Sequence, residues 1–424
     1  MSMLPHRLQA SLTSDWWRVN RIFGKPNHHF AASRPNLGAG SMNIVFVNRY
    51  SFSYLGGVET HMLNLAQELK KSGHTVTLVC QDDRRKDSGW VPQSNDIRIV
   101  QVSGLLGLYN FLQREVGSTD VCHAHLARST FSCCGVFFAW WFGIPTVFTP
   151  HCFYPGTSFR NRLLKWLYDR TITRLTFRLC CCVINLTPQD QRDSAERGMS
   201  LAKSRIIPNS ISLVKLLNAA AVPCEKRYAV PRPYLLHVGR FHNTKCIDFL
   251  VKNLPALEGI GLLLIGQDDD SLPRVSQLVH ALGLERRVCI IQRVDFQELC
   301  SAYRDALALV LASRYEGLPT VILEAAAFGI PTIAARVGGV PFIVEDGVNG
   351  YLYDWGDDKG YVECVHRAVS EGQHVGRVAK ATLTERFCWE VNAKKIAAVY
   401  RELSEGPDVR KRQHCGSKAV DELC

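Results

Sequence analysis

Two signatures that would place this chain in common functional classes are missing. No pair of cysteines has Cys-x-x-Cys spacing, and the 16 cysteines occur as Cys133–Cys134, Cys180–Cys182 and scattered single residues. This pattern argues against a zinc ribbon and against a thioredoxin-type redox motif. We therefore expect free thiols in a reducing compartment.

No secretory signal peptide is recognised either. Residues 1–41 contain no continuous apolar core, and their role stays unassigned.

One uncharged run, residues 131–149, approaches the length of a membrane span, but Gly143 and Pro145 interrupt it. We expect a buried helix followed by a buried strand there, and a cytoplasmic protein.

Length and charge suggest how the chain is organised and what it attracts. At 424 residues it exceeds the usual size of one hydrophobic core, so two domains are expected. The formal net charge of +11 favours anionic partners such as phosphates, acidic lipid or nucleic acid, without choosing among them.

Short apolar runs alternate with helical patterns along most of the chain, which is typical of parallel sheets covered on both faces. The fold class is therefore α/β, with two doubly wound, Rossmann-like domains; the resemblance described below implies that they face a central cleft. The strands expected are 43–48, 75–80, 97–102, 121–125, 146–149, 181–186, 234–238, 261–266, 288–292, 307–312 and 331–334.

Breaks in this alternation set the predicted boundaries. Apolar residues at roughly helical spacing predict a closing helix near the C-terminus. The predicted ranges are an extension at 1–41, the first domain at 42–213, a linker at 214–233, the second domain at 234–385, the closing helix at 386–405 and a polar tail at 406–424.

Two glycine loops could approach a ligand. Gly56 and Gly57 lie between the first strand and its helix, where backbone N–H groups favour phosphate, although such turns are more often structural. The loop lacks the Gly-x-Gly-x-x-Gly dinucleotide fingerprint. In the second half, Gly239 and Arg240 follow a strand and Lys245 comes five residues after Arg240, so two cations could neutralise a diphosphate or be solvated surface charges.

The most informative motif is the run from Glu316 to Glu324, which also contains Gly317 and Leu318. It follows an apolar strand and opens a helix. Its two carboxylates are eight residues apart, so both can face a ligand placed over the helix N-terminus. Carboxylates accept hydrogen bonds from sugar hydroxyls.

With these motifs the chain, over roughly residues 42–403, resembles the retaining GT-B glycosyltransferases of the family 4, group 1 type. That family includes bacterial mannosyl- and glucosyltransferases of lipid and polysaccharide assembly. The residues that carry the resemblance are Glu316 and Glu324 as the Glu-x7-Glu motif, Gly56–Gly57, Val238–Arg240, Lys245 and Gly338–Pro341.

The resemblance implies roles for individual residues. Glu316 would contact the donor sugar near the reacting carbon, Glu324 would bind the nucleotide ribose, and Arg240 and Lys245 would hold the diphosphate. His151, in the segment Thr149-Pro150-His151, would line the reaction centre, although a histidine after a strand is otherwise often a packing residue. The N-terminal domain would be the acceptor side and the C-terminal domain would bind the nucleotide sugar. Gly56 and Gly57 would also lie at the diphosphate, and Gly239, Gly317 and Leu318 would lie beside the donor sugar and nucleotide.

Two departures from the family pattern concern turnover and donor choice. Cys246 stands after Lys245 where the family usually has glycine, and Asn209–Ser212 replaces its usual Asn-Gly-Val-Asp. Cys246 could alter how the loop closes, and Ser210 and Ser212 could change the hinge.

His123 and His125 lie at strand spacing on one face and could suggest a metal pair, but no carboxylate or cysteine ligand is assignable beside them. His125 could face the cleft. Because the resembling family works without a divalent ion, we expect no metal and no cofactor.

Residues 158–178 predict a basic amphipathic helix, which can lie on an anionic membrane surface or be an ordinary domain helix with solvated cations. The cationic residues in it are Arg160, Arg162, Lys165, Arg170, Arg174 and Arg178.

The function expected is transfer of a hexose-type sugar, with retention, from a nucleotide diphosphate sugar to a hydroxyl of a sugar or lipid-linked acceptor, in polysaccharide, lipopolysaccharide or glycolipid synthesis. A nucleotide-sugar epimerase and a non-catalytic basic membrane-binding protein are the alternatives. The interleaved aromatic and basic residues of a nucleic-acid module are missing.

Overall fold

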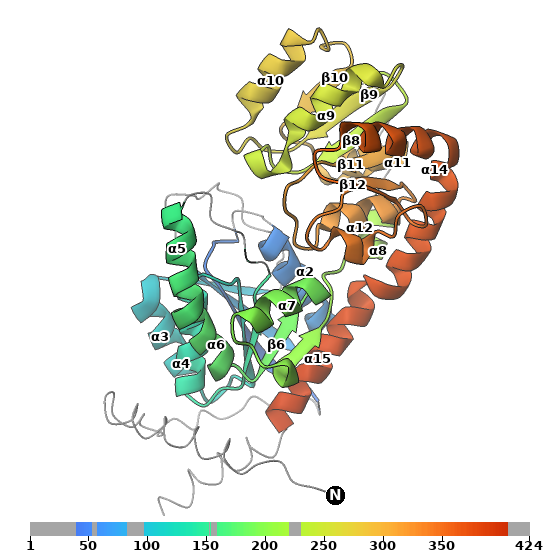
Figure 1. Cartoon of the computed structure of the whole chain (residues 1–424). Helices are drawn as coiled ribbons and strands as arrows, with labels where there is room; N and C mark the ends of the chain where they lie inside the picture. The colour runs from blue at the N-terminus through green and yellow to red at the C-terminus, as the bar shows by residue number, and fades with distance from the viewer. Residues whose placement is uncertain are drawn as a thin grey trace, which may run out of the picture.

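The computed structural model describes residues 40–52, 57–82, 97–151, 153, 159–219 and 230–405. Gly56, most of the predicted extension and the tail from 406 onward lie outside these residues. Figure 1 shows two domains, with the red C-terminal helices returning alongside the N-terminal domain.

In the described part of the chain, the N-terminal sheet has seven strands in the order β3-β2-β1-β4-β5-β6-β7. All neighbours that pair do so in parallel, as in the register Ile44 to Val76 and Ile44 to Val121. The strands are β1 Asn43–Asn48, β2 Thr75–Gln81, β3 Arg98–Val102, β4 Val121–His125, β5 Thr146–Thr149, β6 Cys182–Asn185 and β7 Ser204–Ile206.

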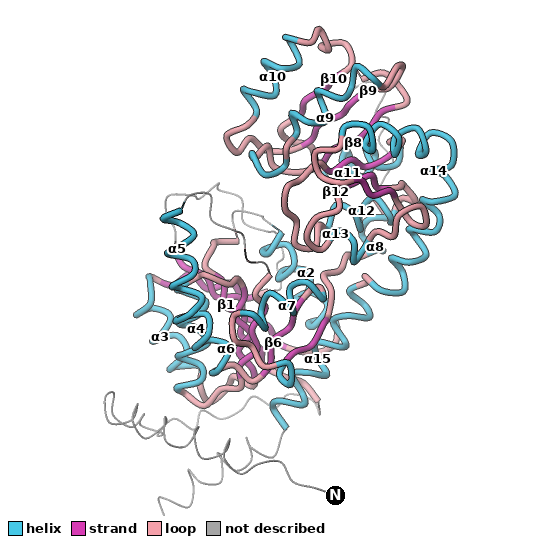
Figure 2. Tube along the Cα trace, in the orientation of Figure 1, coloured by secondary structure: helices cyan, strands magenta, loops and turns pink. Residues whose placement is uncertain are grey.

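Helices cover both faces of this sheet (Figure 2). The predicted buried helix and strand of the uncharged run are present as α4 and β5. The helices are α2 Gly57–Lys71, α3 Gly104–Glu115, α4 Thr130–Trp141, α5 Phe159–Tyr168, a π-helical segment Asp169–Thr173, α6 Arg174–Leu179 and α7 Pro188–Glu196.

The C-terminal sheet has six described strands in the order β10-β9-β8-β11-β12-β13 and is also parallel. The strands are β8 Tyr234–Val238, β9 Gly261–Ile265, β10 Val288–Ile291, β11 Ala308–Leu311, β12 Thr332–Ala335 and β13 Tyr351–Tyr353. The helices are α9 Ile247–Asn253, α10 Leu272–Ala281, α11 Phe296–Asp305, α12 Thr320–Ala327, α13 Val340–Ile343, α14 Asp358–Arg386 and α15 Trp389–Glu405.

The continuous apolar runs reflect burial on both faces of each strand. In β9, Leu262 and Leu264 enter one core cluster while Leu263 and Ile265 enter another on the opposite face. No polar alternation is required of such a strand, which is why the sequence reads as an unbroken run. Every predicted strand is present to within one or two residues, whereas the three-residue strands β7 and β13 are additional.

The predicted linker and closing helix differ in detail. Helix α8 (Leu213–Leu217) begins one residue before the predicted linker, extends into it and packs Leu216 into the core of the C-terminal domain. The closing helix begins at Trp389 rather than at 386, because the long helix α14 runs to Arg386 and Cys388 bridges to Ile211. Trp389, Ile396 and Tyr400 of α15 are buried in the N-terminal core.

In the described part of the chain, no helix is long and apolar enough to span a membrane.

Candidate active site

The carboxyl ends of the parallel strands in both sheets point toward the space between the domains, where α/β proteins bind ligands. The loops that follow β11 and β12 stack on each other there. A Cβ atom on Gly338 would collide with the carbonyl of Glu316, and one on Gly339 with the carbonyl of Gly317. The Cβ added to Gly339 would also lie 2.9 Å from Cγ2 of Thr187, which follows β6 of the other domain. Gly338 and Gly339 are therefore needed where the two domains approach.

Glu316 lies at the centre of the C-terminal side. One oxygen, Oε1, accepts a hydrogen bond from Nζ of Lys245 at 2.6 Å and another from Oγ of Ser313 at 2.6 Å. The Glu316 side chain is 7% exposed and that of Lys245 is 25% exposed, so this ion pair is largely shielded from solvent. The structure thus brings together the predicted sugar contact and one predicted diphosphate ligand.

His237, at the end of β8, belongs to the same region. Its Nδ1 is 3.0 Å from the carbonyl oxygen of Val310, and its buried Nε2 has no partner among the described residues. Burial lowers the pKa of His237 to about 4, so the ring is neutral at pH 7. Sequence reasoning missed this residue, since a histidine inside an apolar strand resembles a packing residue.

Arg240 forms an ion pair with Asp269, whereas Lys245 is paired with Glu316. Its Nη1 donates to Oδ2 of Asp269 at 2.8 Å, and its side chain is 53% exposed. The Gly239 carbonyl lies against Gly266, where a Cβ would collide with it. An incoming diphosphate would have to draw Arg240 away from Asp269 and compete with Glu316 for Lys245.

Glu324 lies in the second turn of α12 and is partly buried. Its Oε2 accepts a hydrogen bond from the Tyr303 hydroxyl at 2.8 Å, and burial raises its pKa above the ordinary value. Between the two carboxylates, Leu318 packs into the hydrophobic core. The hydrogen bond from Tyr303 therefore fixes the orientation of the Glu324 carboxylate.

On the N-terminal side, His151 follows β5 and is buried, with its backbone in the left-handed region at φ 65°. Its Nε2 lies 3.2 Å from Nδ1 of His125, which ends β4. Leu126 and Arg128 in the neighbouring loop also have positive φ. Non-glycine residues in this conformation are uncommon and concentrate at functional sites.

The two strand histidines have different hydrogen-bond partners, although their rings pack together with centroids 4.0 Å apart. His123 contacts the Tyr400 hydroxyl at 2.6 Å and Oγ1 of Thr149 at 2.8 Å, while His125 contacts His151. Burial lowers the pKa values of His123, His125 and His151 well below 6.5, so all three are neutral at pH 7. A third partner, His61 of α2, was missed because its helical spacing is that of a core residue.

Gly57 is the first residue of α2, and a Cβ added there would meet nothing within 4 Å. Its backbone N–H stands at a helix N-terminus, as predicted, but the position does not demand glycine on steric grounds. The role of Gly57 in binding a donor stays a prediction.

The comparisons with known proteins match both halves of the chain. The family described as "Glycosyltransferase Family 4" covers residues 55–215, and "Glycosyl transferases group 1" covers residues 232–371. The chain belongs to the group 1, family 4 glycosyltransferases. The transferase is 24% identical over 387 residues to the phosphatidylinositol N-acetylglucosaminyltransferase GPI3 subunit of Saccharomyces cerevisiae, covering 85% of this chain and 83% of the relative.

A second relative, D-inositol 3-phosphate glycosyltransferase of Thermobifida fusca, is 30% identical over 182 residues, which is 40% of this chain and 42% of the relative. Among solved structures, Anabaena Alr3699/HepE in complex with UDP and glucose superimposes with a TM-score of 0.71 at 19% identity, over 85% of this chain and 100% of that chain. Sucrose-phosphate synthase from Thermosynechococcus elongatus gives 0.70 at 21% identity, over 85% and 99%. The predicted two-domain GT-B fold is confirmed.

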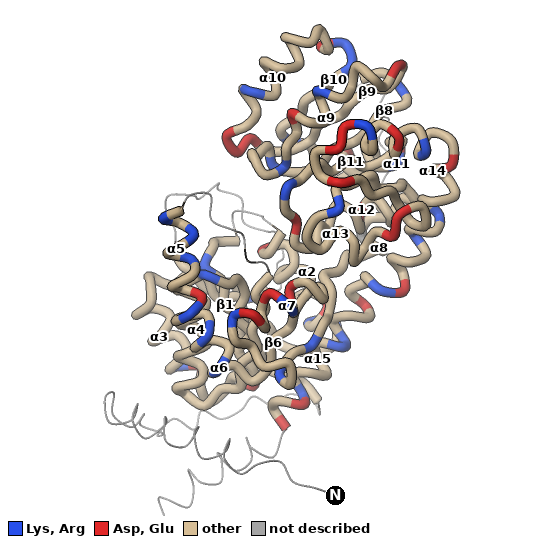
Figure 3. The backbone as a smooth tube through the Cα atoms, viewed as in Figure 1, with Lys and Arg blue, Asp and Glu red and all other residues tan. Residues whose placement is uncertain are grey.

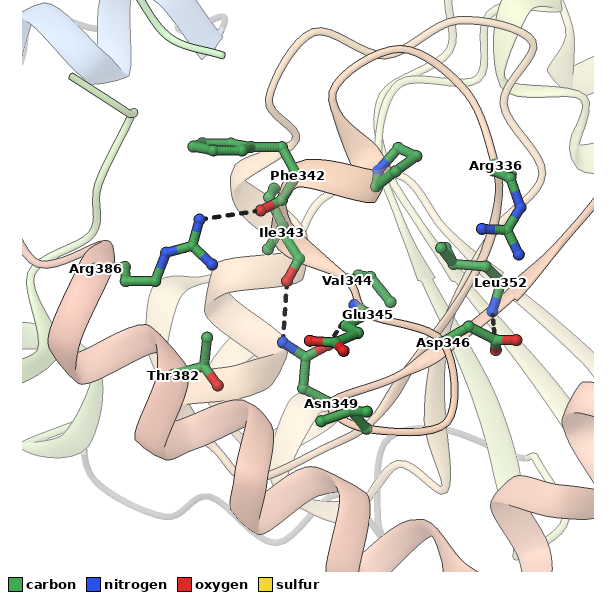
Figure 4. A pocket seen from close by; sticks show the side chains of 12 residues that line it. Arg336, Phe342, Ile343, Val344, Glu345, Asp346, Asn349, Leu352, Thr382 and Arg386 are labelled. Atoms are coloured by element: carbon green, nitrogen blue, oxygen red, sulfur yellow. Dashed lines mark hydrogen bonds between the residues drawn. The ribbon is translucent and has the colours of Figure 1, made fainter. Parts of the chain in front are cut away.

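A separate hollow of about 350 Å³ lies in the C-terminal domain between α13 and α14 of the transferase (Figure 4). Arg336, Asp346 and Arg386 are among the residues that line it. None of the residues predicted for the donor site lines it, so it is not part of the interdomain site.

Proposed function

We propose that the transferase moves a hexose-type sugar from a nucleotide diphosphate sugar to a hydroxyl acceptor, with retention of the anomeric configuration. The observation that supports this most is the shielded pair of Lys245 and Glu316 at the carboxyl edge of the C-terminal sheet. A cation for the leaving group and a carboxylate for sugar hydroxyls stand together there, beneath the Gly338–Gly339 loop.

In the proposed reaction, the bond between the anomeric carbon and the diphosphate oxygen breaks with its electron pair going to the diphosphate. Lys245 and Arg240 neutralise the charge that develops. The acceptor hydroxyl attacks from the same face of the sugar, and its proton passes to the departing diphosphate. Positioning and electrostatic stabilisation supply the rate enhancement, so no divalent metal or other cofactor is needed.

His151 stands on the acceptor side and is proposed to touch the transferred sugar. As a neutral imidazole it can donate one hydrogen bond and accept another, which suits a sugar hydroxyl. Glu324, supported by Tyr303, is proposed to accept hydrogen bonds from the nucleotide ribose. Gly239, Gly317 and Leu318 are proposed to lie beside the same donor, although the Leu318 side chain packs into the hydrophobic core.

The acceptor is proposed to be carried at a membrane surface, as a glycolipid, lipopolysaccharide or lipid-linked oligosaccharide precursor. Helix α5 has no buried residues and exposes Phe159, Leu164 and Trp166. Figure 3 shows basic residues along this helix, which suits anionic lipid headgroups. One relative is named for transfer to phosphatidylinositol. We propose a cytoplasmic enzyme held peripherally at the inner face of the membrane.

The test is donor turnover measured with and without acceptor, in EDTA, with the product anomer read by NMR. Retention and acceptor-dependent turnover that survives EDTA would support the proposal. Free isomerised sugar without acceptor would support the epimerase alternative, and loss of turnover in EDTA that a divalent ion restores would overturn the metal-free mechanism.

Glu324→Ala provides a binding readout for the same proposal. Donor affinity measured by calorimetry should weaken severalfold, because one hydrogen bond from a ribose hydroxyl to a charged group is lost. Unchanged donor binding would show that Glu324 does not contact the nucleotide.

A further inference from the structure

Three histidines from three different elements converge beneath the interdomain space. His61 comes from α2, His125 from the end of β4, and His151 from the turn after β5. One ring nitrogen of each histidine can be chosen so that the three nitrogens all lie within 4.8 Å of one another. All three side chains are buried. Buried imidazoles packed this closely, without a carboxylate assigned to them, need a physical explanation.

The spacing of two of them matches a metal centre. Two nitrogens that each lie about 2.0–2.1 Å from a tetrahedral zinc ion are about 3.3–3.4 Å apart. His125 Nδ1 and His151 Nε2 are hydrogen-bonded at 3.2 Å, which is close to this value, so an ion bound by both nitrogens would take the place of that hydrogen bond. For His61 to become the third ligand, its ring nitrogen would have to move by roughly 1–1.5 Å toward the other two nitrogens, which a change in the side-chain torsion angles can provide.

The hydrogen bonds of Asn209 identify the free nitrogen of His61. Asn209 Oδ1 accepts the backbone N–H of Ser210 at 2.9 Å, so this atom is the carbonyl oxygen of the amide. His61 Nδ1 lies 2.9 Å from the same oxygen and must therefore carry the proton. The lone pair is then on Nε2, which is buried and has no partner among the described residues. A histidine oriented in this way by a second group is the usual form of a metal ligand.

Other polar atoms around the cluster are also unsatisfied. His125 Nε2 and the indole Nε1 of Trp389 have no partner among the described residues, and the Trp389 ring is 5.0 Å from that of His61. Unpaired buried polar groups are uncommon, and these two would be satisfied by water or by an anion beside the proposed metal ion.

We propose that His61, His125 and His151 form a site for a divalent transition-metal ion of the zinc type, and that an ion bound there prevents His151 from contacting the sugar. Three neutral imidazoles leave a fourth position for water or an anion. The ion is not part of the transfer chemistry, so its effect is inhibitory and is opposed by chelators.

The experiment uses the full chain, stripped with EDTA, dialysed and titrated with Co²⁺ while visible absorption is recorded. We expect one equivalent to bind with the spectrum of a nitrogen-ligated ion. His61→Gln, His125→Gln and His151→Gln should each weaken binding at least tenfold, whereas His280→Gln, an exposed histidine of the C-terminal domain, should bind as the parent does. Melting curves establish that each variant is folded.

Asn209 provides a test that a merely structural role would not pass. Asn209→Ala leaves all three ligands but removes their orienting partner, so Co²⁺ affinity should fall by roughly 10- to 100-fold. Asn209→Asp keeps an acceptor oxygen and should restore most of it.

Three outcomes would overturn the proposal. Equal Co²⁺ affinity in the parent and in His125→Gln would remove the site. A thiolate charge-transfer band that disappears in Cys181→Ser would assign the ion to the exposed Cys181 instead. Zinc that binds the cluster without slowing sugar transfer would overturn the inhibitory role.

Discussion

At the residue scale, Cys246 shows how one side chain can conflict with its backbone. It follows Lys245 and adopts the left-handed conformation, with φ 48°. Residues with a Cβ are disfavoured there by about 1–2 kcal/mol, whereas glycine is not. The glycine usual in the family at this position therefore has a conformational reason.

We predict that Cys246→Gly raises the stability of the C-terminal domain. The gain should be about 0.5–1 kcal/mol, because relief of the strained φ is partly offset by the greater entropy of glycine in the unfolded chain. Thermal melting checks this, and Cys246→Val, which puts a β-branched residue in the same conformation, should melt below the parent. A lower Tm for the glycine variant would show that contacts of the thiol outweigh the backbone term.

Asp190 supplies a pH-dependent prediction at the same scale. It lies in α7, close to the contact between Thr187 and Gly339, and burial raises its pKa to about 7. The folded protein binds this proton more tightly than the unfolded chain, whose aspartate titrates near 3.8. This group's contribution to the free energy of unfolding is thus present at low pH and is lost as pH rises from about 4 through about 7.

Asp190→Asn should remove that loss, so its Tm should exceed that of the parent at pH 8 by more than at pH 5. Asp305→Asn, at an ion pair on the surface of the other domain, serves as the control and should show no such widening. If the Tm difference between Asp190→Asn and the parent does not change with pH, Asp190 is not a buried aspartic acid that stays neutral near pH 7.

At the element scale, α5 and the π-helical segment after it form a surface helix whose C-terminal end is held by hydrogen bonds to the rest of the domain. Asp169, the first residue of the π-helical segment, accepts hydrogen bonds from both Arg128 and Arg197. Both guanidinium groups also lie over the ring of Phe153, at 5.6 and 4.3 Å from its centre. The anchored end fixes the direction in which the apolar and basic residues of α5 face solvent.

We predict that the transferase binds anionic vesicles and that replacing Arg160, Arg162 and Lys165 with glutamine weakens co-sedimentation at low salt. Each cation near an anionic leaflet contributes about 1 kcal/mol, and salt should reduce the effect. The charge-matched control replaces Arg286, Arg377 and Lys380 of the C-terminal domain, and nucleotide binding should be intact in both variants. If both triple variants lose vesicle binding equally, the net charge rather than α5 is responsible.

At the scale of the whole molecule, the chain crosses between the domains twice, and the two crossings are bonded to each other. The backbone N–H of Ile211 donates to the Phe387 carbonyl at 3.0 Å, and the backbone N–H of Trp389 donates to the Ile211 carbonyl at 3.2 Å. Asn392 of α15 adds hydrogen bonds to Ser210 Oγ at 2.8 Å and to the Arg386 carbonyl at 2.9 Å. Ser210, which departs from the family pattern, is thus part of a paired hinge.

Asn392→Ala should lower the Tm and reduce turnover while leaving donor affinity unchanged, because the proposed donor residues Lys245, Glu316 and Glu324 lie within the C-terminal domain and only domain closure is affected. The Ser210 hydroxyl, which is buried, and the Arg386 carbonyl, which is partly buried, each lose one hydrogen bond, which costs about 1–3 kcal/mol. In a double-mutant cycle with Ser210→Ala, the two effects on Tm should be less than additive. Fully additive losses would show that the Asn392–Ser210 bond does not couple the two crossings.

The sequence alone predicted the two parallel sheets, nearly all strand ranges, and the loops that carry Lys245, Glu316 and His151. These features are local. An apolar run of strand length that is buried on both faces can be recognised from its own residues, whatever its position in the sheet. The loops at the carboxyl ends of parallel strands lie along one edge of the sheet, so they can be grouped without knowing the strand order. The group 1, family 4 resemblance rested on the same local motifs.

Contacts between segments far apart in the chain were decided only by tertiary structure. The pairing of Lys245 with Glu316, the approach of Gly339 to Thr187 and the meeting of His61 with His151 each join elements whose distance depends on sheet order and domain orientation. The closing helix, recognisable by its spacing, packs on the N-terminal domain because Trp389 and Tyr400 complete that domain's core. Periodicity shows which face of a helix is apolar, but the partner of that face is set by the packing of the whole chain.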